Sequence, residues 1–203
     1  MSKPAQHRNA LTKEVRGRLN ELLRQKQFAK VISLLEPIYD GKDPYTATVL
    51  GFAWIGKGIE GRNNEIAMGY YRTAAEAGNA FGQQGYSACL KRVGRKDEAL
   101  EWLKHSSDNG RDASSQLLYW HYRRAGNTKF SLEYLSRAAE QGHVLSAQRV
   151  AWNKVFGRYG ISKIPQGFAE LWRNSPKVIV YANDYMDKYP EEFEKGKWCG
   201  IVR

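Results

Sequence analysis

The sequence predicts an all-α fold, an α-solenoid of antiparallel helix pairs. The main observation is a repeat with a period of 32 residues, in which an aromatic residue is followed eight positions later by a glycine. The three clear copies are Tyr70 with Gly78, Trp102 with Gly110, and Tyr134 with Gly142. A fixed period of this size is typical of stacked two-helix units, because each unit buries its apolar face only against its neighbours.

Two further patterns support the repeat. Glycines that can end helices recur at nearly even intervals, at Gly78, Gly94, Gly110, Gly126 and Gly142. Small residues occupy one register of the first helices (Thr46, Gly82, Ser114, Ser146) and one register of the second helices (Ala74 and Ala75, Ser106 and Ser107, Ala138 and Ala139). We expect helices to approach closely at these positions, with the neighbouring aromatic residues serving as core.

The first elements follow from apolar spacing and from capping residues. Apolar residues at helical spacing predict helices over about residues 11–23 and 28–38. Asp43 is a typical N-cap and Pro44 suits the first helical position, so a third helix is expected from residue 44 to about residue 55.

A loop with three glycines is expected over residues 56–64, and a helix over about residues 65–77 follows it. The later helices form pairs. They are expected at residues 80–93 with 96–109, at residues 112–125 with 129–141, and at residues 144–156, which begin a fourth unit.

After a longer loop, a short helix is expected around Trp172, and Ser175 with Pro176 is expected to start a separate capping helix. The domain prediction is therefore a flexible basic tail (1–9), a single helical-repeat domain (10–189) and a C-terminal tail (190–203). The repeats fall near residues 28–78, 80–110, 112–142 and 144–175, and the capping helix at 176–189.

Composition restricts the function classes. The chain of 203 residues has a formal net charge of +11, and residues 1–30 contribute six of these charges through eight basic and two acidic residues. Such a balance favours acidic partners, nucleic acid or an anionic surface, although a basic first helix can also be simply solvated. The sequence lacks an apolar run of membrane-spanning length and an apolar segment typical of a signal peptide, so a cytoplasmic location without membrane contact is expected. Cys89 and Cys199 are expected to be free thiols rather than a disulfide.

The region from Ala47 to Asn79 resembles a Sel1-like repeat, a relative of the tetratricopeptide repeat. Its first helix reads A-x-x-L-G-x-x-W, its loop begins G-K-G-I at Gly56, and its second helix reads A-x-x-Y-Y-x-x-A-A-E-x-G-N. The resemblance covers about residues 28–175. It implies antiparallel helix pairs and a non-enzymatic scaffold or adaptor, of which a toxin-neutralising, immunity-type protein is one form.

The sequence offers little catalytic chemistry. The four histidines lack metal-ligand spacing, and phosphate-binding and nucleophile-elbow motifs are missing from the sequence. We expect no enzymatic activity, no cofactor and no metal. The acidic row of Glu76, Asp108 and Glu140 is interpreted as part of the repeat.

The candidate site is the concave face, which the first helices line in such a solenoid. Aligning these helices on Leu50, Tyr86, Leu118 and Val150 places a row of glutamines, several aromatic residues and a basic patch toward the groove. The candidate partner-binding residues are Phe52, Gln84, Lys91, Arg92, Gln116, Trp120, Arg123, Arg124, Gln148 and Trp152. Glutamine can bond a peptide backbone, tryptophan gives a rigid anchor and arginine takes a carboxylate bidentately.

Two functional interpretations remain open beside a purely structural one, in which the tryptophans pack between layers and the basic residues only solubilise helix ends. The favoured interpretation is a scaffold or adaptor that binds a protein partner with an acidic surface or peptide. The alternative is binding of RNA or single-stranded DNA through the basic N-terminus and the groove.

Overall fold

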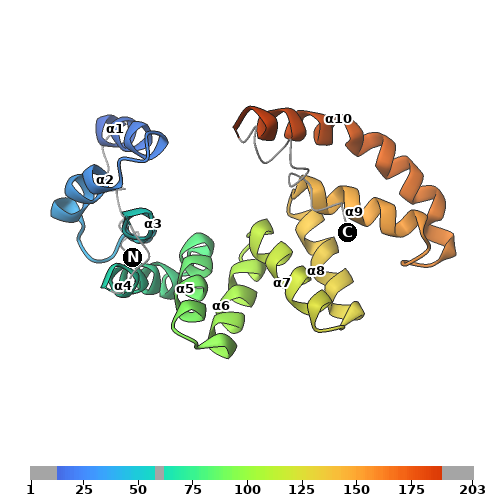
Figure 1. Cartoon of the computed structure of the whole chain (residues 1–203), viewed down its shortest axis with the longest axis horizontal. Coiled ribbons are helices and arrows are strands. Elements are labelled where there is room, and N and C mark those ends of the chain that lie inside the picture. Colours follow the sequence, from blue (N-terminus) through green and yellow to red (C-terminus); the bar gives the residue numbers. More distant parts are fainter. Residues whose placement is uncertain (1–12, 58–61, 189–203) are drawn as a thin grey trace, which may run out of the picture. The chain divides into compact units, whose positions relative to one another are not determined.

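The computed structural model describes residues 13–57 and 62–188. Over these residues it contains helices and no strands, which confirms the predicted all-α class (Figure 1). The predicted tails, residues 1–9 and 190–203, lie outside the described residues, as do Cys199 and the middle of the glycine-rich loop. The α-helices are α1 (Lys13–Arg24), α2 (Phe28–Leu35), α3 (Pro44–Lys57), α4 (Arg62–Glu76), α5 (Ala80–Arg92), α6 (Lys96–Asp108), α7 (Asp112–Arg124), α8 (Thr128–Glu140), α9 (Val144–Val155) and α10 (Ile164–Lys188).

The chain divides into two compact units at Gly110 and Arg111. Unit 1 contains α1 to α6, and unit 2 contains α7 to α10. Within each unit, consecutive helices pack against one another, α3 on α4 and α5 on α6 in unit 1, α7 on α8 and α9 on α10 in unit 2. Helices that are consecutive in the sequence therefore pack as antiparallel hairpins, as the repeat predicts.

The predicted glycine turns are confirmed. All five glycines of the even series have a positive φ, between +73° and +100°. Side chains with a Cβ rarely adopt this conformation, so glycine allows each helix to end and the next to return.

The starts of several helices are capped by side chains. Asp43 accepts a hydrogen bond from the Thr46 N–H (2.9 Å), as the sequence predicts. Asn79, Asn127 and His143 cap α5, α8 and α9 in the same way, each accepting from the N–H three residues later. Each cap satisfies a backbone donor that the helix itself leaves unpaired.

The core follows the predicted registers. Unit 1 has two apolar clusters, one from α1, α2 and α3 around Leu35 and Leu50, and one from α4, α5 and α6 around Tyr71 and Leu90. In unit 2, Leu118 is fully buried. Burial of such a side chain contributes about 1.5–3 kcal/mol.

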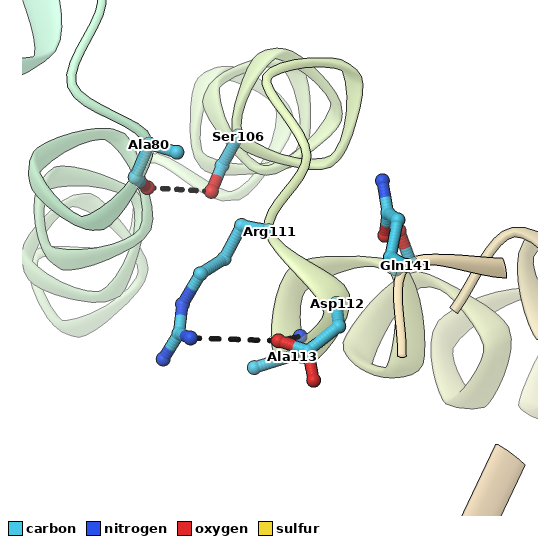
Figure 2. A network of polar contacts seen from close by, with 7 residues as sticks. Ala80, Ser106, Arg111, Asp112, Ala113 and Gln141 are labelled. Atoms are coloured by element: carbon cyan, nitrogen blue, oxygen red, sulfur yellow. Dashed lines mark hydrogen bonds and ion pairs between the residues drawn. The ribbon is translucent and has the colours of Figure 1, made fainter. Parts of the chain in front are cut away.

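Helices α4 and α5 approach closely at small residues. A Cβ added to Gly82 would lie 2.4 Å from the Ala74 Cβ, far inside van der Waals contact. Helices α5 and α6 are also joined by hydroxyl groups. Ser106 Oγ donates to the Ala80 carbonyl (2.6 Å) (Figure 2). Ser87 Oγ donates to the Ala99 carbonyl (2.6 Å). These serines therefore combine small size with hydrogen bonds that connect α5 directly to α6.

Two predicted boundaries are wrong. The helix expected over residues 28–38 changes to a 3-10 turn at Glu36–Ile38, because Pro37 has no N–H to donate to the helix. The loop expected over residues 56–64 is shorter, since α4 already begins at Arg62. Asn64 is a poor helix former, but it is buried in the packed unit, and tertiary packing overrides its local preference.

The expected separate capping helix is also wrong. Helix α10 runs without a break through Ser175 and Pro176. Proline cannot donate to the Trp172 carbonyl one turn earlier, but Ser175 Oγ donates to that carbonyl instead (2.9 Å). The serine hydroxyl thus replaces the hydrogen bond that proline removes.

We predict that Gly82→Ala lowers the free energy of unfolding by about 1–3 kcal/mol, because the new methyl group overlaps Ala74. Gly69→Ala is the matched control. It lies inside α4 with no atom within 4 Å of the added Cβ, and it should raise stability by about 0.5–1 kcal/mol. Urea unfolding of both variants measures the difference, and equal effects of the two substitutions would contradict the packing constraint.

We predict a pH dependence from His143. Its Nδ1 accepts from the Ser146 N–H (3.1 Å), and burial lowers the pKa of the imidazole, against a smaller opposing effect of Asp112. The unfolded chain, with an ordinary pKa of about 6.5, binds the proton more readily, so stability is lost as pH falls through this value. His143→Asn keeps a capping acceptor without the titration. Melting temperatures between about pH 8 and 5 should fall more steeply for the wild type, and parallel profiles would exclude this role.

Candidate functional site

An arginine and tyrosine contact joins α7 to α9 in unit 2. The Tyr119 hydroxyl accepts hydrogen bonds from Arg123 Nη1 (2.6 Å), on the same helix, and from Arg149 Nη1 (3.2 Å), on α9. The Tyr119 side chain is buried, and so the hydroxyl is held in one place while both guanidinium groups bond to it.

Trp120 completes this group. The guanidinium carbon of Arg123 lies 5.3 Å from the Trp120 ring centroid, and that of Arg149 lies 5.0 Å from it. Both distances are in the range of cation–π attraction, which is strongest for tryptophan. We call Tyr119, Trp120, Arg123 and Arg149 the aromatic–arginine cluster. Its geometry shows two cations positioned around one half-buried ring.

A second aromatic contact lies farther along α9. Trp152 and Phe156 stack with ring centroids 5.7 Å apart and an interplanar angle of 20°. Both are exposed, at 44% and 69% of their surfaces. Arg149 stands three residues before Trp152, so the stacked pair and the cluster share one side of α9.

The charge of this region is positive. Apart from Asp112 in its first turn, α7 has no acidic residue, and its last turn carries Arg123 and Arg124. Helix α9 has no acidic residue and adds Arg149 on this side. Exposed aromatic rings beside guanidinium groups can bind carboxylates and apolar groups of one ligand together.

The predicted site residues therefore differ in their surroundings. In unit 2, Trp120 and Arg123 belong to the cluster, Trp152 is exposed beside it, and Arg124 is exposed at the end of α7. Tyr119 and Arg149 are not among the residues predicted from the sequence. Both stand next to the anchor positions Leu118 and Val150, and the aromatic–basic pattern on consecutive first helices is the signal that could have indicated them.

The predicted glutamine row is half-buried in unit 2. Gln116 and Gln148 are half-buried. The Gln148 Oε1 atom is buried, and among the described residues it has no hydrogen-bond partner. In this conformation it cannot accept from the N–H of a bound peptide.

In unit 1, Phe52 is exposed on 51% of its surface and meets Phe28 edge to face, with ring centroids 5.7 Å apart. Gln84 is half-buried, whereas Lys91 and Arg92 are exposed at the end of α5. Positive side chains at a helix C-terminus also interact favourably with the helix dipole. A groove that continues through both units stays a prediction.

Other chemistry is sparse in the described part of the chain. There, no group of three or more His, Cys, Asp or Glu side chains is arranged to hold a metal ion. Cys89 is a free, buried thiol whose pKa is raised by burial, which makes it a poor nucleophile. None of the helices among these residues has the length and apolar character needed to cross a membrane.

The geometry defines a class of protein, an α-solenoid of antiparallel helix pairs. The sequence matches no protein-family model and no curated protein. Among solved structures, the fold is similar to the crystal structure of a Sel1 repeat protein from Oxalobacter formigenes. That similarity has a TM-score of 0.63 and 17% sequence identity, and it covers 92% of this chain and 84% of the other. The chain thus has the Sel1-like repeat fold.

We predict that Tyr119→Phe lowers the free energy of unfolding by about 1–3 kcal/mol, because it removes the acceptor of two charge-assisted hydrogen bonds. Tyr122→Phe is the control, since the Tyr122 ring stacks on Tyr134 (centroids 5.4 Å apart) and keeps that contact. Its effect should stay within about 0.5 kcal/mol. Chemical unfolding compares the two, and a Tyr119 effect as small as the control would show that the arginine contacts add no stability.

Proposed function

We propose that the chain is a non-enzymatic protein-interaction scaffold, and that the α7 and α9 face of unit 2 binds an acidic segment of a partner protein. The Sel1-like repeat fold supports a scaffold, because such stacked helices present extended surfaces for binding. An inhibitor that neutralises an acidic partner is one form that this function can take.

The observation that carries the proposal is the arrangement around Trp120. Arg123 bonds Tyr119 and lies against the Trp120 ring, and among the residues that the structure describes it makes no ion pair with a carboxylate. A guanidinium group presents five N–H donors, so Arg123 retains donors for a ligand. Because its position is already restricted, binding would cost less side-chain entropy than for a mobile arginine.

Trp152 and Phe156 supply the apolar part of the surface. Rigid, partly exposed aromatic residues beside arginine are typical of interface hot spots. We therefore infer a partner segment that combines carboxylates with apolar side chains, with the carboxylates near Arg123 and Arg124.

The test is co-purification from the native host with the tagged full chain. We expect specific partners to be retained by the wild type and lost by Trp120→Ala combined with Arg123→Gln. With a purified partner, this variant should lower affinity at least about 100-fold, which corresponds to a hot-spot loss of about 2.7 kcal/mol. The matched control is Trp172→Ala combined with Lys163→Gln, an exposed tryptophan and an exposed lysine outside the α7 and α9 face. An unchanged partner list for the cluster variant would refute the proposal.

The wild type and the same variants also distinguish binding of a protein partner from binding of nucleic acid. A protein partner predicts moderate salt dependence and no shift of single-stranded RNA or DNA in a gel at about 50 mM salt. A shift that disappears steeply with added salt would instead support the alternative function.

A further inference from the structure

Unit 2 contains a cavity of about 540 Å³ between α8, α9 and α10. This size is within the range of small-molecule sites. Its apolar lining includes Ala139, Ala147 and Val150, and its polar lining comes largely from α10 and the residues before it. The cavity lies on a different side of α9 from the aromatic–arginine cluster, because residues 147, 150 and 154 follow one helical stripe and residues 149, 152 and 156 another.

One wall of the cavity is built from a largely buried ion pair. Lys154 Nζ, on α9, lies 2.7 and 2.8 Å from the two carboxylate oxygens of Glu170, on α10. The side chains are only 15% and 13% exposed. Gln166 Nε2 also donates to Glu170 (2.8 Å). These bonds occupy both charges, so the pair positions α10 on α9 and leaves little net charge of its own in the cavity.

Tyr159 fixes another part of the lining. Its hydroxyl lies 2.9 Å from Ser136 Oγ and donates to the Leu132 carbonyl on α8 (3.2 Å). Burial raises the pKa of this hydroxyl, which therefore stays neutral near pH 7. The cavity is thus held by polar contacts to α8 and to α10.

The remaining charges favour an anion. Arg173 and Lys177 line the cavity from α10, one turn apart and exposed, and Glu140 lines it from α8. Two cations against one carboxylate leave an excess of one positive charge beside an apolar interior. A guanidinium and an ammonium group one turn apart can bind the two oxygens of one carboxylate.

We propose that this cavity binds a carboxylate carried on a short aliphatic chain, with the carboxylate at Arg173 and Lys177 and the chain against Ala147 and Val150. This chemistry has two sources, a free aliphatic monocarboxylate or the C-terminal residue of a peptide with an apolar side chain. The site goes beyond the proposed scaffold function, since it uses none of the cluster residues. Loss of one site should therefore leave the other intact.

Calorimetry on the full chain tests the proposal with four probes. They are hexanoate, hexanol, the peptide acetyl-Ala-Ala-Leu with a free carboxylate, and the same peptide as its C-terminal amide. We expect saturable binding of at least one carboxylate, with a Kd on the order of 1 mM or tighter. Hexanol and the amide should bind at least about tenfold more weakly than the corresponding carboxylates.

Arg173→Gln combined with Lys177→Gln should lower carboxylate affinity at least about tenfold. Both side chains are exposed, so the variant should melt like the wild type. Lys129→Gln combined with Lys163→Gln removes the same charge from exposed positions outside the cavity and should bind like the wild type. Tighter binding of hexanoate indicates a free carboxylate, and tighter binding of the peptide indicates a C-terminus.

Three results would overturn the proposal. They are absence of binding by both carboxylates, equal binding of carboxylates and their uncharged analogues, and equal effects of the two double variants. The variant Arg173→Gln combined with Lys177→Gln should still retain the protein partners of the wild type. That result would show that the cavity and the scaffold function are independent.

Discussion

Close approach of neighbouring helices at small side chains is the constraint on which both units depend. Gly82 leaves no room for a Cβ against Ala74, and Gly167 leaves none against the backbone of α9. In unit 2, Ser114 and Ser146 occupy the same register as Gly82 and are almost completely buried. Dispersion contacts grow with close packing, so short hairpins without a single central core can still be stable.

This constraint also determines where larger side chains can lie. Small residues occupy the helix positions that face the neighbouring helix most closely. Aromatic and basic residues of the first helices therefore occupy the positions beside them. Tyr119 illustrates the consequence, because its ring is buried while its hydroxyl reaches Arg123 and Arg149. Tyr119 thus packs between helices and at the same time positions the two arginines at the surface.

Helix α9 connects the two candidate sites of unit 2. One side carries Arg149, Trp152 and Phe156, and another carries Lys154, whose ion pair with Glu170 holds α10. Breaking a largely buried pair of this kind is costly, since one charge is left without a partner. Lys154 is therefore a residue that supports the cavity rather than one that is free to bind a ligand.

The sequence by itself determined the repeat, the helix pairs, the glycine turns and the buried small registers, because each depends on local backbone preference or on spacing along one helix. It also indicated Trp120 and Arg123 as surface candidates. Only the tertiary structure decided that α10 continues through Pro176, that Gln148 buries its oxygen, and that Tyr119 and Arg149 meet. The Tyr119–Arg149 contact joins side chains 30 residues apart, and the continuity of α10 depends on one hydroxyl that replaces a missing donor. Helical periodicity contains no information about either.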